Sequence, residues 1–302
     1  MSADLQADTA VRPDGDVANR YHVALPSHWD FVAPSGGVLM SVALRAAEAH
    51  LAEPHLRFAS ATTVFCTPLL ATNLVIDVTE LRRGKATSQL RVAIRHRDVA
   101  PDPEDATDNG RGLELLTTFV RDRKGPDVMA ATMPRVRKLA DSLPVEDGTP
   151  HNPHTRFAFF QQLEARIAEG EPLWASDQPP GPARYARWFR YRTPQRDALG
   201  RFDRLALPPL MDTMPSALTR AIGTGGYRFF APSLDLTTYV VDDTTCEWLL
   251  VATSVRRAHR GWAIGECEVW DEDGRFVAHG TQAMYVAGVA GQPPVLDATQ
   301  RD

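Results

Sequence analysis

The chain has 302 residues, of which 43% are hydrophobic and 24% charged, and its formal net charge is −5 at pH 7. This length and composition indicate a globular protein of one large domain or two ordinary ones. The acidic balance argues against broad nucleic-acid binding, which requires a basic surface. The three cysteines form no C-x-x-C pair, so we expect neither a disulfide framework nor a zinc cluster, and a reducing, cytoplasmic location.

Both ends of the chain are expected to be tails. Residues 1–20 contain four aspartates and no apolar core, so they predict a disordered segment and not a signal peptide. Residues 291–302 are expected to form a second tail. No apolar run reaches the length of a membrane span, because Arg45 and Glu48 interrupt the longest one.

Residues 21–130 predict a first domain, in which strands follow a buried helix. Residues 36–51 contain good helix formers and are apolar nearly all round, as a buried helix requires. Apolar and polar residues alternate in 73–81 and again in 89–95, which is the period of half-buried strands. Arg83 and Gly84 predict the turn between them. Pro, Asp and Gly dominate residues 98–112, which predict a loop, and residues 113–121 predict another strand.

The same plan begins again after a break. Residues 131–155 contain four prolines without clear periodicity and predict a linker. Residues 156–290 then form the expected second domain, with a strand at 184–192, a helix at 208–222 and strands at 233–241, 247–255, 262–270 and 275–286. Repetition of one plan suggests internal duplication. Runs of strands with one segregated helix indicate an α+β fold and not a parallel α/β fold.

Short motifs occur in a fixed order along both halves. They are His28-Trp29, Pro34-Ser35-Gly36-Gly37 and LRRGK at 81–85 in the first half, and Leu210-Met211-Asp212, PSLDL at 232–236, EWLL at 247–250, WDEDGR at 270–275 and GTQ at 280–282 in the second. In this order they resemble the acyl-CoA thioesterase II group and its thioesterase-like relatives, between about Tyr21 and Val286. The expected fold is therefore a double hot-dog, in which two fused repeats each wrap a long helix in a curved antiparallel sheet.

The resemblance implies hydrolysis of acyl-CoA thioesters to fatty acid and CoA. That family orients the attacking water with an Asp, a Thr or Ser, and a Gln in its second hot-dog. Matched to this sequence, these are Asp212, Ser233 and Gln282. Ser233 stands where the family more often has Thr, and it keeps the hydroxyl. The partner implied is a small-molecule acyl-CoA, with no cofactor or metal, and a homo-oligomer is left open.

The chemistry of hydrolysis suits these residue types. A carboxylate can take the proton of water as general base, while a hydroxyl and an amide fix its direction. The N-terminus of a buried helix offers backbone N–H groups to a developing oxyanion. Gly36 and Gly37 lie where the first helix should begin, so they are candidates for oxyanion or substrate binding. The sequence contains no G-x-S-x-G elbow that would supply a covalent serine nucleophile.

Each of these residues also has a plainer interpretation. Asp212 could cap a helix, Gln282 could make a structural hydrogen bond from the apolar face of its strand, and Gly36-Gly37 could be a tight turn. His151 and His154 lack a ligand framework for a metal, and the acidic run at 271–274 lacks the later Glu of an EF-hand. The basic groups at 82–85 and 256–260 could hold CoA phosphates, although a solvated turn is the favoured interpretation of each.

Two other functions stay open at this point. Hot-dog hydratases and dehydratases use a His with an Asp near the helix, whereas here the second-half helix has no His, and His28 with Asp30 precedes the first one. A non-catalytic acyl-CoA-binding protein, or a scaffold whose active site has decayed, would share the fold, and activity alone distinguishes it from an enzyme.

Overall fold

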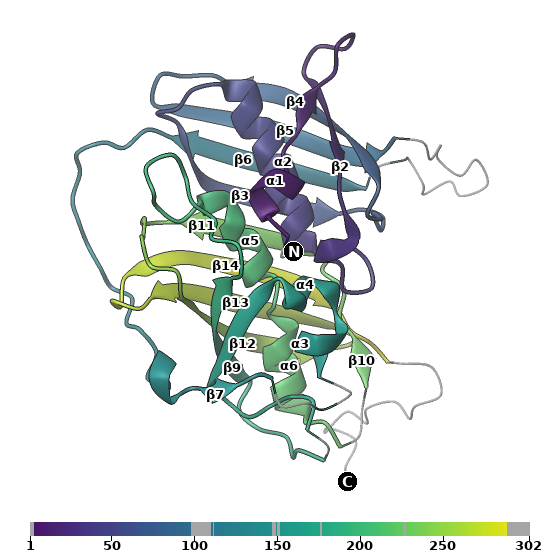
Figure 1. The fold of residues 1–302 in the computed structure, drawn as a ribbon, viewed down its shortest axis with the longest axis vertical. Coiled ribbons are helices and arrows are strands. Elements are labelled where there is room, and N and C mark those ends of the chain that lie inside the picture. Colours follow the sequence, from purple (N-terminus) through teal and green to yellow (C-terminus); the bar gives the residue numbers. More distant parts are fainter. Residues whose placement is uncertain are drawn as a thin grey trace.

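The strands of the two halves of this chain are arranged in the same order, and the two sets join edge to edge at the centre of one sheet (Figure 1). The computed structural model describes residues 3–97, 110, 112–146, 149, 152–175, 177–225 and 228–288. The expected tail at 291–302 and most of the expected loop at 98–112 lie outside these ranges.

The described residues of the first half, 3–97, 110 and 112–120, form a short helix, a long helix and six strands. Its elements are α1 (Leu5–Asp8), β1 (Arg12–Pro13), β2 (Arg20–Ala24), the 3-10 turn η1 (Ser27–Trp29), α2 (Gly36–Leu51), β3 (Arg57–Phe65), β4 (Asn73–Arg82), β5 (Thr87–His96) and β6 (Leu113–Val120). The helix predicted at 36–51 is confirmed to the residue, because its apolar side chains are buried on every side.

The second half repeats this plan with shorter helices. Its elements are η2 (Leu139–Asp141), β7 (Leu143–Pro144), α3 (Pro153–Arg156), α4 (Ala158–Gln161), β8 (Leu163–Glu169), β9 (Arg184–Tyr191), η3 (Arg204–Ala206), α5 (Leu207–Met211), α6 (Pro215–Ile222), β10 (Phe229–Phe230), β11 (Asp235–Val240), β12 (Leu249–His259), β13 (Trp262–Asp271), β14 (Phe276–Tyr285) and β15 (Ala287–Gly288). The strands predicted for this half are confirmed, with shifts of a few residues at their ends.

The sheet order shows that the halves are equivalent. Within the described part of the chain its 13 strands run β1-β2-β4-β5-β6-β3-β11-β14-β13-β12-β9-β8-β7. From each side towards the centre, β2-β4-β5-β6-β3 matches β9-β12-β13-β14-β11, so each half orders its five main strands alike. At the junction β3 and β11 pair antiparallel with Thr62 opposite Thr237, whose hydroxyls lie 3.0 Å apart. This is the expected α+β double hot-dog, with a pseudo-two-fold axis near these threonines.

The helices of the two halves meet on the inner side of the sheet (Figure 1). Gly37, in the first turn of α2, permits the close approach of α5. A Cβ atom on Gly37 would lie only 2.4 Å from the carbonyl oxygen of Pro208, which is closer than real Cβ contacts come. The glycine at this position therefore serves the packing of α2 against α5.

The helix expected at 208–222 is interrupted, which corrects the expectation of a long helix in the second half. It ends at Met211 and begins again at Pro215, with Asp212 in the break. Pro215 has no N–H to donate to the carbonyl of Met211, and its ring would clash with that carbonyl in a continuous helix. Proline is well tolerated in the first turn, so α6 begins there.

The expectation that residues 1–20 form a disordered tail is wrong for residues 3–20. Leu5 of α1 is fully buried in the main core. The indole Nε1 of Trp29 donates to Asp8 at 2.9 Å, and the amide of Ala3 donates to Gln162 Oε1 at 3.0 Å. The polar composition suggested disorder because the partners of this segment lie far away in the sequence.

The expected linker at 131–155 is packed against the second half. Its apolar side chains, including Met133 and Val136, cover a cluster on the outer face of the sheet that contains Trp188 and Trp270. The indole of Trp188 also donates to the carbonyl of Arg137 at 3.2 Å. The segment therefore both connects the halves and shields apolar surface that would otherwise face water.

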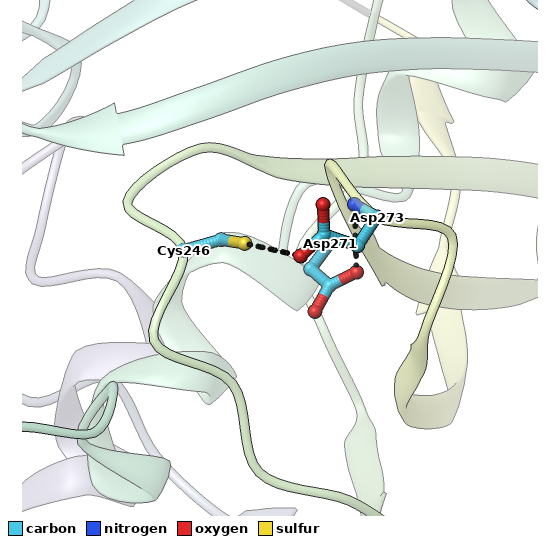
Figure 2. A group of neighbouring side chains, drawn as sticks. All are labelled: Cys246, Asp271 and Asp273. Carbon is cyan, nitrogen blue, oxygen red and sulfur yellow. Dashed lines mark hydrogen bonds between the residues drawn. The ribbon is translucent and has the colours of Figure 1, made fainter.

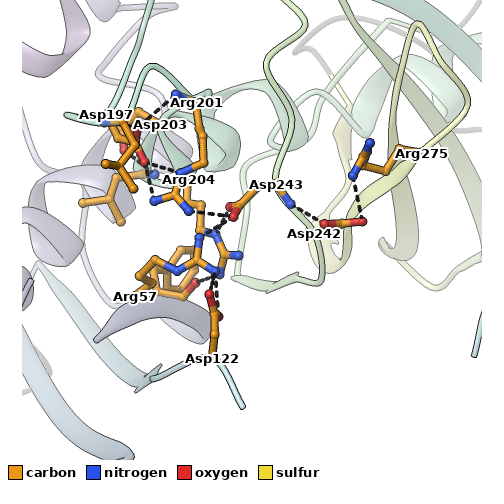
Figure 3. Close-up of polar contacts among 12 residues, drawn as sticks. Arg57, Asp122, Asp197, Arg201, Asp203, Arg204, Asp242, Asp243 and Arg275 are labelled. Carbon is orange, nitrogen blue, oxygen red and sulfur yellow. Dashed lines mark hydrogen bonds and ion pairs between the residues drawn. The ribbon is translucent and has the colours of Figure 1, made fainter. Parts of the chain in front are cut away.

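Ion pairs also join the two halves (Figure 3). The carboxylate of Asp243, after β11, accepts hydrogen bonds from Arg57 on β3, from Arg201 at 2.9 Å and from Arg204 at 2.8 Å. Arg57 also pairs with Asp122 at 2.6 Å. One carboxylate of the second half thus holds an arginine of the first.

Candidate active site

Asp212 lies in the break between α5 and α6, where its side chain turns towards the first half. It is only 8% exposed. As the C-cap residue that follows α5, it has a backbone conformation outside the helical region, and its carboxylate reaches the N-terminus of α2. The proline that interrupts the helix is therefore what positions this side chain.

The three residues predicted to act together converge on one point. Oδ1 of Asp212 accepts hydrogen bonds from the Ser233 hydroxyl at 3.0 Å and from Gln282 Nε2 at 2.6 Å. Gln282 Nε2 also lies 2.6 Å from the oxygen of Ser233. These side chains are separated by 21 to 70 residues in the sequence, so the fold alone brings them together.

The sheet places Ser233 and Gln282 side by side. Ser233 precedes β11 and forms an isolated bridge with Met284 on β14, which also carries Gln282. Gln282 is 1% exposed, and its Oε1 has no hydrogen-bond partner among the described residues. A buried polar atom without a partner costs free energy, so this oxygen is suited to accept a hydrogen bond from a bound molecule.

The other oxygen of Asp212 is held by the first half. Oδ2 accepts hydrogen bonds from the Ser35 hydroxyl at 2.8 Å and from the Gly37 amide at 3.0 Å. Burial raises the pKa of Asp212, and the donations from Gly37, Ser35, Ser233 and Gln282 oppose that rise. The carboxyl group is therefore more basic than an ordinary aspartate and is still stabilised as an anion.

The two glycines predicted for oxyanion binding differ in their surroundings. The N–H of Gly37 is already used by Asp212. Gly36 is the first residue of α2, and its amide has no acceptor among the residues that the structure describes. A Cβ atom on Gly36 would lie 3.3 Å from Asp212 Oδ2 and 2.6 Å from the ring of Phe65, so its backbone borders the carboxylate directly. Of the two, Gly36 has the amide available for a ligand.

Ser35 is the residue of this site to which the sequence assigned no role. A serine before a helix is the commonest N-cap, and that pattern gave no reason to look further. In the structure its side chain makes no capping hydrogen bond and donates to Asp212 instead. Only the position of Asp212 relative to α2 distinguishes this arrangement from an ordinary cap.

The positions of the first half that the pseudo-two-fold axis relates to Asp212 and Gln282 carry neither a carboxylate nor an amide. Ser41 is the sixth residue counted from the start of α2, as Asp212 is from the start of α5, and it donates to the carbonyl of Leu205. The register of β6 on β3 places Thr117 where β14 has Gln282. Its hydroxyl donates to the carbonyl of Ser60. The described carboxylate site therefore occurs once in the pseudo-dimer.

A second group of side chains has ligand atoms close together (Figure 2). The thiol of Cys246 and the carboxylates of Asp271 and Asp273 lie within 4.8 Å of one another. Asp271 is already occupied, because it accepts from the amides of Asp273 and Arg275 and from the hydroxyl of Thr244 at 2.7 Å. The Arg275 guanidinium also lies 3.5 Å from it. These contacts are those of a hairpin-stabilising carboxylate and not of a metal ligand. His151 of the other discounted pair lies outside the described residues.

Comparison with known proteins identifies the family. Sequence models of the acyl-CoA thioesterase N-terminal and C-terminal domains match residues 25–108 and 138–286. The chain belongs to this acyl-CoA thioesterase family, in agreement with the resemblance seen in its motifs. No curated protein matches the sequence.

Solved structures of low sequence identity share the fold. A hot-dog protein of unknown function from Alicyclobacillus acidocaldarius is 20% identical, with a TM-score of 0.74 and 95% of this chain and 98% of that chain covered. An acyl-CoA thioesterase II from Mycobacterium marinum is 18% identical, with a TM-score of 0.68 and 95% and 100% covered. None of the described helices has both the length and the apolar character needed to cross a membrane.

Proposed function

We propose that this chain hydrolyses acyl-CoA thioesters to free acid and CoA, with a water molecule aimed by Asp212, Ser233 and Gln282. One observation carries the proposal: a buried carboxylate, a hydroxyl and an amide from three separate segments meet within hydrogen-bond distance. Membership of the acyl-CoA thioesterase family supports the substrate class. Action in fatty acid metabolism, in the cytoplasm, is part of the same proposal.

The proposed step begins with the placement of water. All four acceptor positions of the Asp212 carboxylate are filled by protein donors, so one donor must release it when water binds. The Ser233 hydroxyl can do so by rotation about its Cβ–Oγ bond. The unpartnered Oε1 of Gln282 then accepts a hydrogen bond from one O–H of the water, while Asp212 accepts one from the other O–H.

Attack of the water on the thioester and cleavage of the carbon–sulfur bond then follow. The water oxygen bonds to the thioester carbonyl carbon while Asp212 takes its proton as general base. The Gly36 amide, at the positive end of α2, donates to the oxyanion that forms. The carbon–sulfur bond then breaks, and the proton from Asp212 passes to the departing thiolate. No covalent acyl-enzyme is required.

The first test is release of free thiol by the purified full chain from acyl-CoA thioesters of graded length. Turnover without added metal or cofactor is the expected result. Tight binding of acyl-CoA with no thiol release would instead support a non-catalytic acyl-CoA-binding protein. Hydratase or dehydratase activity would need a histidine beside the aspartate, and no described histidine contacts Asp212.

A further inference from the structure

A buried arginine lies on the inner face of the second-half sheet. Along β9, Tyr185, Arg187 and Phe189 alternate with residues of the outer face, so Arg187 points towards α6 among apolar neighbours. It is only 4% exposed. Burial lowers the pKa of Arg187 to about 10, so the guanidinium stays charged at neutral pH.

This charge has no anionic partner among the described residues. Its described contacts are the Ser216 hydroxyl at 2.8 Å, the Nε2 of His154 at 3.4 Å, and aromatic rings. By contrast, Arg184 and Arg190 of the same strand pair with glutamates. A guanidinium carries five N–H donors, and an uncompensated buried charge is costly. The arrangement therefore has spare donors and a charge that an anion would neutralise.

A neighbouring residue on the same face of β9 has a buried donor without a described partner. The hydroxyl of Tyr185 is buried and makes no hydrogen bond with the described residues, although its ring lies 5.4 Å from the Arg187 guanidinium carbon. Burial also raises the pKa of Tyr185 to about 12, so the hydroxyl keeps its proton. A buried cation and a buried neutral O–H donor at alternate positions of β9 suit a carboxylate, which can accept from both.

The same layer of the fold contains the proposed catalytic group. Helix α6 starts just after Asp212, and its Ser216 accepts from Arg187. On the sheet side, Gln282 pairs with Gly265 of β13. Cys267 follows two residues later on the same face of β13, and its row of paired residues continues through Thr253 of β12 to Tyr185 of β9. The side chain of Met214 packs over Gly265. Methionine is unbranched and repacks readily, so an acyl chain could take its place.

We propose that Arg187 and Tyr185 form a buried subsite for a carboxylate at the far end of the acyl group, so that ω-carboxyacyl-CoA thioesters are the preferred substrates. The subsite rests on the proposed thioesterase function, because its ligand is the distal end of the thioester held at Asp212. An acyl group with a plain methyl end would leave the guanidinium without its anion. The preference therefore follows from the charge that the fold buries.

The test compares kcat/KM for an ω-carboxyacyl-CoA with that for the unsubstituted acyl-CoA of equal chain length. The wild type should favour the carboxylated substrate. Arg187→Met should reduce the ratio of the two values about 10- to 100-fold, as expected for loss of a charge-assisted contact. Tyr185→Phe removes only the unpaired hydroxyl and should lower the ratio by a smaller factor. Arg190→Met, on the opposite face of the same strand, should leave it unchanged.

A ratio that is equal in wild type and Arg187→Met would overturn the subsite, as would a wild type that favours the unsubstituted substrate. If Arg187→Met fails to fold, Tyr185→Phe decides by the same comparison. If the wild type cleaves neither thioester, the proposed function fails first. The subsite is then judged by thermal stabilisation with a free straight-chain dicarboxylic acid against its monocarboxylic counterpart, where equal stabilisation contradicts it.

Discussion

At the scale of single residues, the site depends on which atoms share the Asp212 carboxylate. Oδ1 is bonded to residues of the second half and Oδ2 to residues of the first, so the two hot-dogs hold one functional group between them. The sequence predicted the members on the second-half side through the family resemblance. It did not predict the hydrogen bond from Ser35, because a serine before a helix is ordinarily a cap.

Ser233 should act through its hydroxyl. Ser233→Thr keeps that group and should retain most activity, whereas Ser233→Ala removes a hydrogen bond to Asp212 and should lower kcat/KM about 10-fold or more. Steady-state thiol release from both variants gives the comparison. Equal activity of the two would mean that the hydroxyl is not used.

Ser35 should influence the pH profile. Its donation to Asp212 lowers the pKa of that carboxyl group, in opposition to the larger effect of burial. The base must be ionised to work, so activity falls as the pH drops through the pKa of Asp212. In Ser35→Ala that pKa rises, and the acidic limb of kcat/KM should move to higher pH.

A suitable control for Ser35 is Ser41→Ala. The hydroxyl of Ser41 is buried on the same helix but donates to the carbonyls of Gly37 and Leu205. Its removal should leave the acidic limb in place. If Ser35→Ala and Ser41→Ala have superimposable pH profiles, Ser35 has only a structural role.

At the scale of elements, local sequence pattern was enough to predict some helices and strands, whereas others depend on contacts with distant parts of the chain. The alternation in β4 and β5 and the apolar surface of α2 are local properties, and these elements were predicted from the sequence. The break at 212–214 was not predicted, because the apolar pattern continues through it while Pro215 interrupts only the hydrogen bonding. Helix α1 was missed because its burial depends on Trp29 and Gln162, far along the chain.

The contact between α2 and α5 should tolerate no side chain at Gly37. In Gly37→Ala the added methyl group would collide with the backbone of Pro208 and Pro209. We expect a loss of about 1–3 kcal/mol in the free energy of unfolding, as overpacking of a core typically causes. Denaturant unfolding measures it. Gly15→Ala is the matched control, since nothing lies within 4 Å of its Cβ position, and equal stability of the two variants would refute the contact.

At the scale of the whole molecule, two equivalent hot-dogs have become specialised. The first half supplies the N-terminus of α2, and the second supplies the carboxylate, hydroxyl and amide. The equivalent position in the first half has Ser41 and Thr117 bonded to backbone carbonyls. The sequence predicted the duplication from its repeated plan, but this loss of symmetry becomes visible only through the strand register.

The ion pairs around Asp243 should link stability to pH. Burial raises the pKa of Asp243, but hydrogen bonds from Arg57 and Arg204 outweigh it and leave the pKa below its usual value. A carboxylate with a lowered pKa stabilises the fold above its unfolded-state pKa, and this contribution is lost as the pH falls through the lowered value. Asp243→Asn should therefore unfold at lower temperature at pH 7, with about 1–2 kcal/mol less stability.

The difference between wild type and Asp243→Asn should shrink as the pH is lowered through the acidic range. Asp242→Asn is the control, because that neighbouring carboxylate has a 3.6 Å ion pair with Arg275 and accepts the Asp243 amide at 2.8 Å, a hydrogen bond that asparagine can keep. Thermal unfolding of all three proteins from neutral to acidic pH tests the idea. A difference that does not change with pH would rule out the charge as its cause.

The most direct test of the central claim is the turnover of Asp212→Asn. Asparagine keeps the size of the side chain and part of its hydrogen bonding but cannot take the proton of water. General-base catalysis is typically worth about 10²–10⁴-fold, so kcat for thiol release should fall by at least that range while acyl-CoA affinity changes little. Full activity in Asp212→Asn would contradict the account and place the general base elsewhere, with Asp235 and His28 the next residues to examine.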